Sequence, residues 1–304
     1  MSIKLSIIVA VYNQEEYIKQ ALDSILMQQC TYDYEVIIGE DCSTDNTRKV
    51  LQSIENEYPS NFHFIYRKKN YGMQKNFYDL YERMNGEYFI VLEGDDYWTY
   101  EYKIQTQIEF LEKNINCIEC AHNVSVVDSH SQNINIEYPE CKNEYYTLND
   151  YLDGILPGQT ASCMYRNFYK SKMINYDIEN VNYNAGDRKK AFIAVSNGDV
   201  YCFQKKWSAY RYVTSSGNSF SAKRRIGKCE REETLKFYRE LIGYAKKTLK
   251  KEEATYVAEC LYISSIISCI KNNESNIFYL LREFSHLDSK MKIFMHYLQK
   301  AFNK

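Results

Sequence analysis

The chain has 304 residues, of which 45% are hydrophobic, 26% are charged and only three are proline. A chain of this length and composition can bury a sizeable core in one or two domains, which excludes wholesale disorder and collagen-like or low-complexity structure. Its 38 basic residues are balanced by 40 acidic ones, and the formal charge of −2 gives no basic excess that would indicate a nucleic-acid partner.

The first hundred residues alternate between predicted strands and predicted helices. Continuous apolar runs predict strands buried on both faces at residues 4–11, 34–39, 62–66 and 87–92. Apolar residues at helical spacing predict helices between these strands, at residues 15–29, 47–58 and 73–83. Alternation of this kind indicates right-handed crossovers and a mostly parallel sheet.

Acidic clusters follow two of these strands, at residues 40–45 and 93–96. Because ligands bind beyond the carboxyl ends of parallel strands, we expect both clusters at one edge of the sheet. Aspartates that can share one cation suit a hard metal such as Mg²⁺ or Mn²⁺, which would bridge the phosphates of a nucleotide. The alternative for Asp95 and Asp96 is that they start a turn and cap the next helix.

The second half of the chain carries weaker patterns. They predict a helix at 101–113, a strand at 117–127, a polar loop at 128–157, a strand at 158–166, a loop at 176–187, a helix at 188–197 and one or two strands at 200–213. Residues 230–304 contain no proline and one glycine, and their helical periodicity predicts three or four helices.

Neither the cysteines nor the apolar segments indicate secretion. Cys117, Cys120 and His122 lack the second ligand pair that a structural zinc site needs, and their segment is predicted to be a buried strand with reduced thiols. The apolar stretch near the N-terminus has only seven residues, too few for a signal sequence. No uncharged apolar run reaches eighteen residues, so we expect no transmembrane helix.

Five motifs in a fixed order carry a resemblance to a known family. In chain order they read SIIVAVYN, LDSIL, EVIIGEDCSTDNT, NYG and GEYFIVLEGDD. Together they resemble the inverting family 2 glycosyltransferases with a GT-A fold, strongly over residues 3–125 and loosely over 158–220. The resemblance implies an α/β fold with a mostly parallel mixed sheet flanked by helices. It places a catalytic domain at 1–225, with a nucleotide-binding half to about 125, and a helical region at 226–304.

The resemblance also implies which residues hold the donor nucleotide. The backbone of Ala10, Val11 and Tyr12 and the side chain of Asp41 would hold the nucleobase. Lys75 is a candidate contact to a phosphate, or else a solvated helix residue.

The metal and the reacting groups are implied by the later motifs. Asp95 would lie on the ribose and metal side, with Asp96 beside it as an alternative ligand of Mn²⁺ or Mg²⁺. Asp187 would deprotonate the acceptor hydroxyl, the alternative being a helix cap. Glu93 and Arg211 would lie near the donor phosphates, with Arg211 as the available cation of a loop expected to close at 215–219.

Three residues depart from the family pattern. Ala10 replaces the commoner proline, Glu40 replaces an aspartate, and Glu93 replaces the first aspartate of the metal motif. Each keeps size or charge roughly unchanged, so the family assignment stands.

The helical tail is basic, with 14 basic and 10 acidic residues from Gly227 onward. Lysines beside apolar stripes suit an anionic membrane surface that would present a lipid-linked acceptor. The alternatives are that this face packs on the catalytic domain or on a second subunit.

The resemblance implies a glycosyltransferase of the bacterial polysaccharide and cell-wall type. It would move a hexosyl or related sugar from a nucleotide-diphosphate sugar, with UDP favoured over dTDP, to a hydroxyl of a glycan or lipid-linked acceptor. We expect it in the cytoplasm, at or near the inner face of the membrane. The alternatives are a non-catalytic sugar- or nucleotide-binding module, which would have no need of Asp187, and a nucleotidyltransferase, whose Gly-rich phosphate loop is missing after the first strand.

Overall fold

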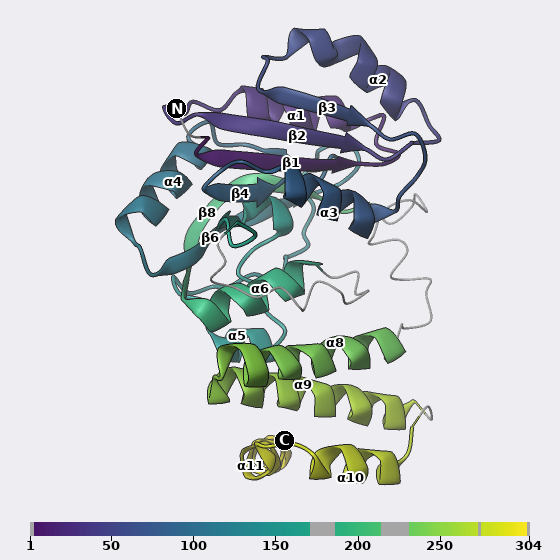
Figure 1. Cartoon of the computed structure of the whole chain (residues 1–304), viewed down its shortest axis with the longest axis vertical. Helices are drawn as coiled ribbons and strands as arrows, with labels where there is room; N and C mark the ends of the chain where they lie inside the picture. The colour runs from purple at the N-terminus through teal and green to yellow at the C-terminus, as the bar shows by residue number, and fades with distance from the viewer. Residues whose placement is uncertain (1–2, 171–185, 214–230, 273–274, 303–304) are drawn as a thin grey trace. The chain divides into compact units, whose positions relative to one another are not determined.

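The computed structural model describes residues 3–170, 186–213, 231–272 and 275–302 (Figure 1). The chain forms two compact units. The first contains Met1–Tyr146, Ile155–Ile174 and Gly198–Ile226, and the second contains Thr147–Gly154, Asn175–Asn197 and Gly227–Lys304. This division differs from the single boundary expected near residue 225, because two segments from within the expected catalytic domain group with the C-terminal helices.

The first unit is built on an eight-stranded mixed sheet with the strand order β3-β2-β1-β4-β7-β6-β8-β5. The strands are β1 (Leu5–Val11), β2 (Tyr34–Glu40), β3 (Phe62–Tyr66), β4 (Tyr88–Val91), β5 (Tyr97–Trp98), β6 (Cys117–Val127), β7 (Met164–Arg166) and β8 (Asp199–Arg211). The pairs among β1, β2, β3 and β4 are parallel, as is β6 with β8, whereas β7 and β5 are antiparallel to their neighbours. The predicted mostly parallel mixed sheet is thus confirmed.

The helices of this unit are α1 (Ile18–Leu26), α2 (Thr47–Ile54), α3 (Met73–Arg83) and α4 (Lys103–Lys113). Each buries an apolar stripe; α1, for example, buries Ile18, Leu22 and Ile25. The central strands are buried on both faces, which explains why β1 and β4 read as continuous apolar runs rather than alternating ones.

The strand register shows where the strands that precede the predicted binding residues end relative to one another. Val11 at the end of β1 pairs with Glu40 at the end of β2, and Glu40 in turn pairs with Tyr66 at the end of β3. β4 runs parallel on the other side of β1, with Ile8 opposite Val91. The two acidic clusters therefore follow strands that end at the same edge of the sheet.

The segment after Pro157 differs from the strand predicted at 158–166. A 3₁₀ turn at Thr160–Ser162 precedes a strand of only three residues, β7. The side chain of Gln159 accepts a hydrogen bond from the backbone N–H of Ala161, and such local bonds compete with a strand ladder. The turn is packed tightly, since a Cβ added to Gly158 would lie 2.2 Å from the Ser162 Oγ.

The second unit is helical. Its elements are α5 (Leu148–Leu152), α6 (Gly186–Asn197), α8 (Arg231–Gly243), a π-helical turn at Tyr244–Leu249, α9 (Glu252–Lys271), α10 (Ile277–Ser285) and α11 (Lys290–Phe302). The four helices after residue 230 confirm the predicted helical tail. The helix α9 packs against α5, α8, α10 and α11. By length and composition alone α9 is apolar enough to cross a membrane, and most of its apolar window is buried within the structure.

Candidate active site at the carboxyl edge of the sheet

Asp96 lies in the turn that follows β4 and faces inward. It is only 2% exposed. Its Oδ1 accepts the backbone N–H of Arg211 at 2.8 Å, and its Oδ2 accepts the Nε2–H of Gln159 at 2.7 Å. Both carboxylate oxygens are thus engaged by the protein, so Asp96 ties the end of β4 to β8 and to the turn before β7.

Asp95 is half-buried and is held differently. Its Oδ1 accepts a hydrogen bond from Gln14 Nε2 at 3.2 Å, and its backbone carbonyl accepts one from Arg211 Nε at 2.9 Å. The Oε1 of Gln14 is buried and has no hydrogen-bond partner among the described residues. Hydrogen bonds within the described part of the chain therefore engage one carboxylate oxygen of Asp95, against two of Asp96.

The acidic turn concentrates negative charge in a place of low solvent access. Burial raises the pKa of the Asp95 carboxyl and raises that of Asp96 well above its usual range. The charges of Asp95 and Glu93 raise the pKa of Asp96 further, and hydrogen bonds from Arg211 and Gln159 offset this only in part. A bound cation would favour the ionised form of these carboxyls.

Arg211 joins this turn to several other segments. It is 3% exposed, and its guanidinium lies 4.3 Å from the ring centroid of Tyr17. Its five N–H groups donate to the carbonyls of Asp95, Asp128 and Ser129, to Gln20 Oε1 and to Ser131 Oγ. Arg211, expected near the donor phosphates, lies against the acidic turn, and a direct contact with a diphosphate would require one of these bonds to break. In this structure Arg211 positions the turn.

Asp41 lies after β2 and is 2% exposed. Its two carboxylate oxygens accept the backbone N–H groups of Tyr71, at 2.7 Å, and Gly72, at 2.9 Å. Its backbone N–H donates to the carbonyl of Val11 at 3.0 Å. Asp41 therefore connects the ends of β1 and β2 with the segment that begins α3, and the predicted nucleobase contacts are neighbours at this edge.

The predicted phosphate contact Lys75 is exposed on α3. Its Nζ lies 5.2 Å from the ring centroid of Tyr71, and the guanidinium of Arg67 lies 5.3 Å from the same centroid. Both cations thus lie near the ring of Tyr71, and Asp41 accepts the backbone N–H of the same residue. Ala10 is half-buried and Tyr12 is 39% exposed, so the end of β1 presents both backbone and an aromatic side chain.

Glu40 is fully buried and forms an ion pair with Arg48. Its Oε1 also accepts the backbone N–H of Ser43 at 2.5 Å. Glu40, which replaces the aspartate of the family pattern, therefore has a structural role at this edge of the sheet.

Asp187 belongs to the second unit, where it lies in the first turn of α6 and is half-buried. Its Oδ1 accepts the backbone N–H of Arg188 at 2.7 Å. This contact fits an aspartate near a helix N-terminus, and the general-base role stays a prediction. The loop expected to close at 215–219 lies outside the described residues.

Two glutamines at this edge were not predicted from the sequence. Gln159 donates to Asp96 and, at 3.3 Å, to Glu93, while Gln14 donates to Asp95. No local sequence pattern identifies them as site residues, because each donates its hydrogen bonds to acidic residues more than sixty positions away. The only signal was the Pro157-Gly158 turn, which places Gln159 at a bend.

Residues 6–173 match the family described as glycosyl transferase family 2. The chain belongs to this family. The match covers more than half of the chain and includes both acidic clusters, though not Asp187 or Arg211.

The relatives that match in sequence align with only part of the chain. An uncharacterized protein of Mycobacterium tuberculosis is 40% identical over 123 residues, which are 40% of this chain and 36% of that protein. The teichoic acid poly(glycerol phosphate) polymerase of Staphylococcus epidermidis is 31% identical over 158 residues, 52% of this chain and 21% of the polymerase. The chain thus spans about a third or less of the length of these relatives.

Solved glycosyltransferase structures share the fold over most of the chain. S. aureus TarS (residues 1–349), in complex with UDP-GlcNAc, superposes with a TM-score of 0.64 at 17% identity, covering 88% of this chain and 73% of that one. The mannosyltransferase PcManGT from Pyrobaculum calidifontis, in complex with GDP-Man and Mn²⁺, gives a TM-score of 0.55 at 13% identity, covering 88% and 75%. These similarities confirm a GT-A-like fold for this family 2 glycosyltransferase.

Proposed function

We propose that this family 2 glycosyltransferase moves a sugar from a nucleotide-diphosphate sugar, with UDP-sugars favoured, to a hydroxyl of a glycan or lipid-linked acceptor. The observation that carries the proposal is the pair of half-buried Asp95 and buried Asp96 at the carboxyl end of β4, at the same edge as Asp41. The nucleotide sugars bound by TarS and PcManGT support a donor of this class. The similarity to a teichoic acid polymerase supports a role in making a cell-surface polymer.

The residues at this edge fit a divalent metal, Mn²⁺ or Mg²⁺, held mainly by Asp95. Among the described residues no three His, Cys, Asp or Glu side chains gather to form a complete protein cage. Such a cage is not needed, since Mg²⁺ in phosphate chemistry is usually held by one or two carboxylates together with substrate phosphates. The buried, unpartnered Oε1 of Gln14 beside Asp95 adds a neutral oxygen of the type such ions accept.

Each residue of the edge would then have a distinct task. The backbone at Ala10–Tyr12 and the Asp41 side chain would hold the nucleobase, and Lys75 would offset phosphate charge. When bound, the metal would supply the positive charge that stabilises the departing diphosphate. Asp96, Gln159 and Arg211 would keep the acidic turn in position.

Inverting transfer also needs a base on the acceptor side of the anomeric carbon. A carboxylate at Asp187 would take the proton of the acceptor hydroxyl as the hydroxyl oxygen bonds to that carbon and the diphosphate leaves. We further propose that the enzyme works in the cytoplasm, close to the inner face of the membrane, where lipid-linked acceptors are presented.

A screen for release of nucleoside diphosphate from a panel of UDP-, GDP- and dTDP-sugars, in Mn²⁺, Mg²⁺ or EDTA, tests this proposal. We expect turnover of at least one donor, loss of turnover in EDTA and recovery with Mn²⁺ or Mg²⁺. Undiminished turnover in EDTA would refute the metal. Failure to turn over any donor, with and without glycan acceptors, would refute the activity.

A further inference from the structure

The last two helices display apolar side chains to solvent. On α10 none of the nine residues is buried, and Phe278 is 79% exposed. On α11 Met291 is 73% exposed. The exposed apolar residues, which we call the hairpin face, are Ile277, Phe278 and Leu281 on α10 and Met291, Phe294, Met295 and Leu298 on α11. Their spacing of three and four residues places them along one side of each helix.

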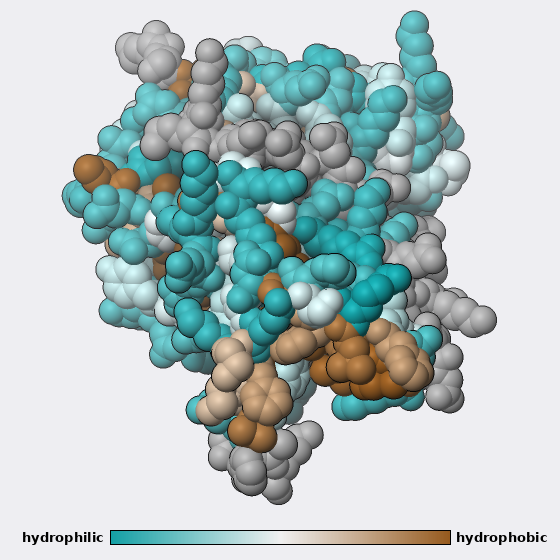
Figure 2. Space-filling model, turned by 60° about the horizontal axis from the view of Figure 1, so that its bottom comes forward, coloured by the Kyte–Doolittle hydropathy of each residue, from teal (hydrophilic) through white to brown (hydrophobic). Residues whose placement is uncertain are grey.

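Figure 2 brings the lower part of Figure 1 forward and shows apolar side chains gathered over these helices. A contiguous apolar surface of this kind marks an interaction site, whereas scattered single apolar residues do not.

The helices α10 and α11 and the loop between them, which we call the hairpin, carry acidic and basic residues with different surroundings. Glu283 accepts the Tyr262 hydroxyl at 2.7 Å and pairs with Arg239 at 3.5 Å, so it is turned toward neighbouring helices. Asp288 pairs with Lys246 at 3.0 Å. Each acidic residue of the hairpin thus has a cationic partner within the unit, and Lys246 is shared between Asp288 and buried Glu259, at 2.9 Å.

The cations of the hairpin lie outward. Lys290 and Lys292 are exposed beside Met291, and no ion pair joins either of them to another described residue. Arg282 is exposed beside Leu281; it pairs with Glu283 at 3.0 Å, and its guanidinium lies 5.2 Å from the ring centroid of Tyr279. The hairpin face is therefore apolar with a positive border.

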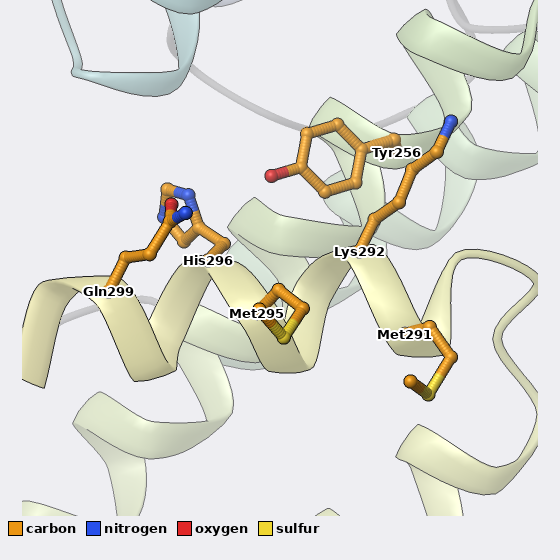
Figure 3. A pocket seen from close by; sticks show the side chains of 6 residues that line it. All are labelled: Tyr256, Met291, Lys292, Met295, His296 and Gln299. Atoms are coloured by element: carbon orange, nitrogen blue, oxygen red, sulfur yellow. The ribbon is translucent and has the colours of Figure 1, made fainter.

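A groove lies at this face. It has a volume of about 410 Å³ and is lined by Tyr256 of α9 and by Met291, Lys292, Met295, His296 and Gln299 of α11. In Figure 3 Tyr256 reaches from α9 toward α11, and its ring centroid lies 6.5 Å from that of His296. Two flexible thioethers beside a lysine and a histidine can accept an acyl chain with its anionic headgroup above it.

We propose that the hairpin face docks on the surface of an anionic lipid bilayer. Apolar side chains on one side of a helix, bordered by lysine and arginine, are the features that hold amphipathic helices in the interface of such a membrane. Anionic headgroups complement the outward cations, whereas a second copy of the same face would bring these cations toward one another. The membrane is therefore the occupant that the charge pattern favours.

Membrane docking is separate from sugar transfer, and vesicle binding can be measured without any transfer assay. The full chain is mixed with vesicles of phosphatidylcholine alone, or with a quarter of phosphatidylglycerol, and the bound fraction is measured by sedimentation. We expect binding to the anionic vesicles, weak binding to the neutral ones, and release of the protein by 0.5 M salt, since salt screens the electrostatic part.

Two variants test the two components of the face. Phe278→Ser/Met291→Ser and Lys290→Glu/Lys292→Glu should each lower the partition to anionic vesicles about tenfold or more. Ile115→Ser and Lys113→Glu are matched controls, since Ile115 is 77% exposed and the Lys113 side chain 76% exposed, and both lie in the first unit. The controls should bind as the wild type does.

Equal binding by all variants, or no binding to anionic vesicles, would overturn the proposal. So would a wild-type dimer in sedimentation velocity that Phe278→Ser/Met291→Ser converts to monomer, because the face would then be covered by a second copy. Circular dichroism melting confirms that each variant folds. Turnover of a soluble nucleotide sugar is measured in parallel, so that failure of the activity and failure of docking are told apart.

Discussion

Asp95 and Asp96 are neighbours in the chain but have different surroundings. Asp96 gives both oxygens to Arg211 and Gln159, whereas Asp95 keeps coordination capacity beside the unpartnered Oε1 of Gln14. The sequence left open which of them would be the main metal ligand. We propose Asp95, because hydrogen bonds within the described part of the chain engage only one of its carboxylate oxygens.

Asp41→Ala should weaken nucleotide binding. The change removes a predicted contact to the base and also frees the Tyr71 and Gly72 amides that the carboxylate now holds. Loss of the base contact costs about 1–3 kcal/mol of binding free energy, which corresponds to a rise in Kd of roughly 5- to 150-fold. Calorimetric titration with UDP measures this, with the exposed Asp33→Asn as control. Equal affinity of Asp41→Ala and wild type would remove Asp41 from the binding site.

Asp187→Asn separates catalysis from binding. The amide keeps an oxygen that can accept the Arg188 N–H but cannot take up a proton. Loss of a general base typically costs about 10²–10⁴ in rate, while donor affinity and melting temperature should stay near the wild-type values. Steady-state transfer and calorimetry on the same preparation measure both. Transfer at the wild-type rate would mean that Asp187 only stabilises the start of α6.

At the scale of elements, the turn after β4 depends on close approach between chain segments. A Cβ added to Gly94 would lie 2.3 Å from the Gln14 Oε1 and 3.0 Å from the Ile18 Cδ1. A side chain at this position must therefore displace Gln14, which is the hydrogen-bond donor to Asp95.

Gly94→Ala should lower donor turnover by about 10- to 150-fold, since loss of a hydrogen bond to a charged group costs about 1.5–3 kcal/mol. Thermal stability should change little, because the Gln14 side chain is flexible at its end. The matched control is Gly243→Ala, whose Cβ would meet nothing within 4 Å. In a double-mutant cycle Gln14→Ala should add no further loss to Gly94→Ala. Fully additive losses would show that the two residues act separately.

Helices and strands were predictable where they follow from a pattern among neighbouring residues in the sequence. The strands β1 to β4 and the helices α1 to α4 follow from continuous apolar runs and helical spacing, which depend only on near neighbours, whereas the two-residue strand β5 was not predicted. The turn at Thr160–Ser162 and the short β7 were not predicted, because the side chain of Gln159 satisfies the backbone there. The short helix α5 was missed for a similar reason, since a capping box of Thr147 and Asp150 starts it within a polar stretch.

At the scale of the whole chain, the long-range contacts lie beyond sequence patterns. Arg211 was predicted near the donor phosphates, and its bonds to Gln20 and to residues 128–131 join positions 80 to 191 residues apart. The grouping of α6 with the C-terminal helices likewise depends on tertiary packing. The sequence therefore predicted that the two acidic clusters follow strands ending at one edge, and the structure adds the residues that hold them there, Gln14, Gln159 and Arg211.

Glu140 makes the stability of the chain depend on pH. Burial raises the pKa of this carboxyl to about 7, although it accepts the Val124 N–H at 3.0 Å. In the unfolded chain the group ionises near its ordinary pKa, so the free energy of unfolding should fall as pH rises from about 4.5 to 7. The full difference is about 3 kcal/mol above that range.

Glu140→Gln removes this titration and should stabilise the chain at pH 8 but not at pH 4, as measured by urea denaturation at both values. Glu137→Gln, whose wild-type side chain is 86% exposed in the same segment, is the control and should behave as the wild type does. A Glu140→Gln variant with the same gain at both pH values would contradict the account.

The central claim is that the carboxyl edge of the sheet turns over a nucleotide-diphosphate sugar with Asp95 as its main metal ligand. The most direct measurement is the rate of nucleoside diphosphate release in saturating Mn²⁺ by the wild type, by Asp95→Asn and by the control Asp33→Asn. The account predicts that Asp33→Asn matches the wild type and that Asp95→Asn loses at least about 10²-fold, the scale of one lost electrostatic contact in a transition state. Wild-type release by Asp95→Asn would contradict it.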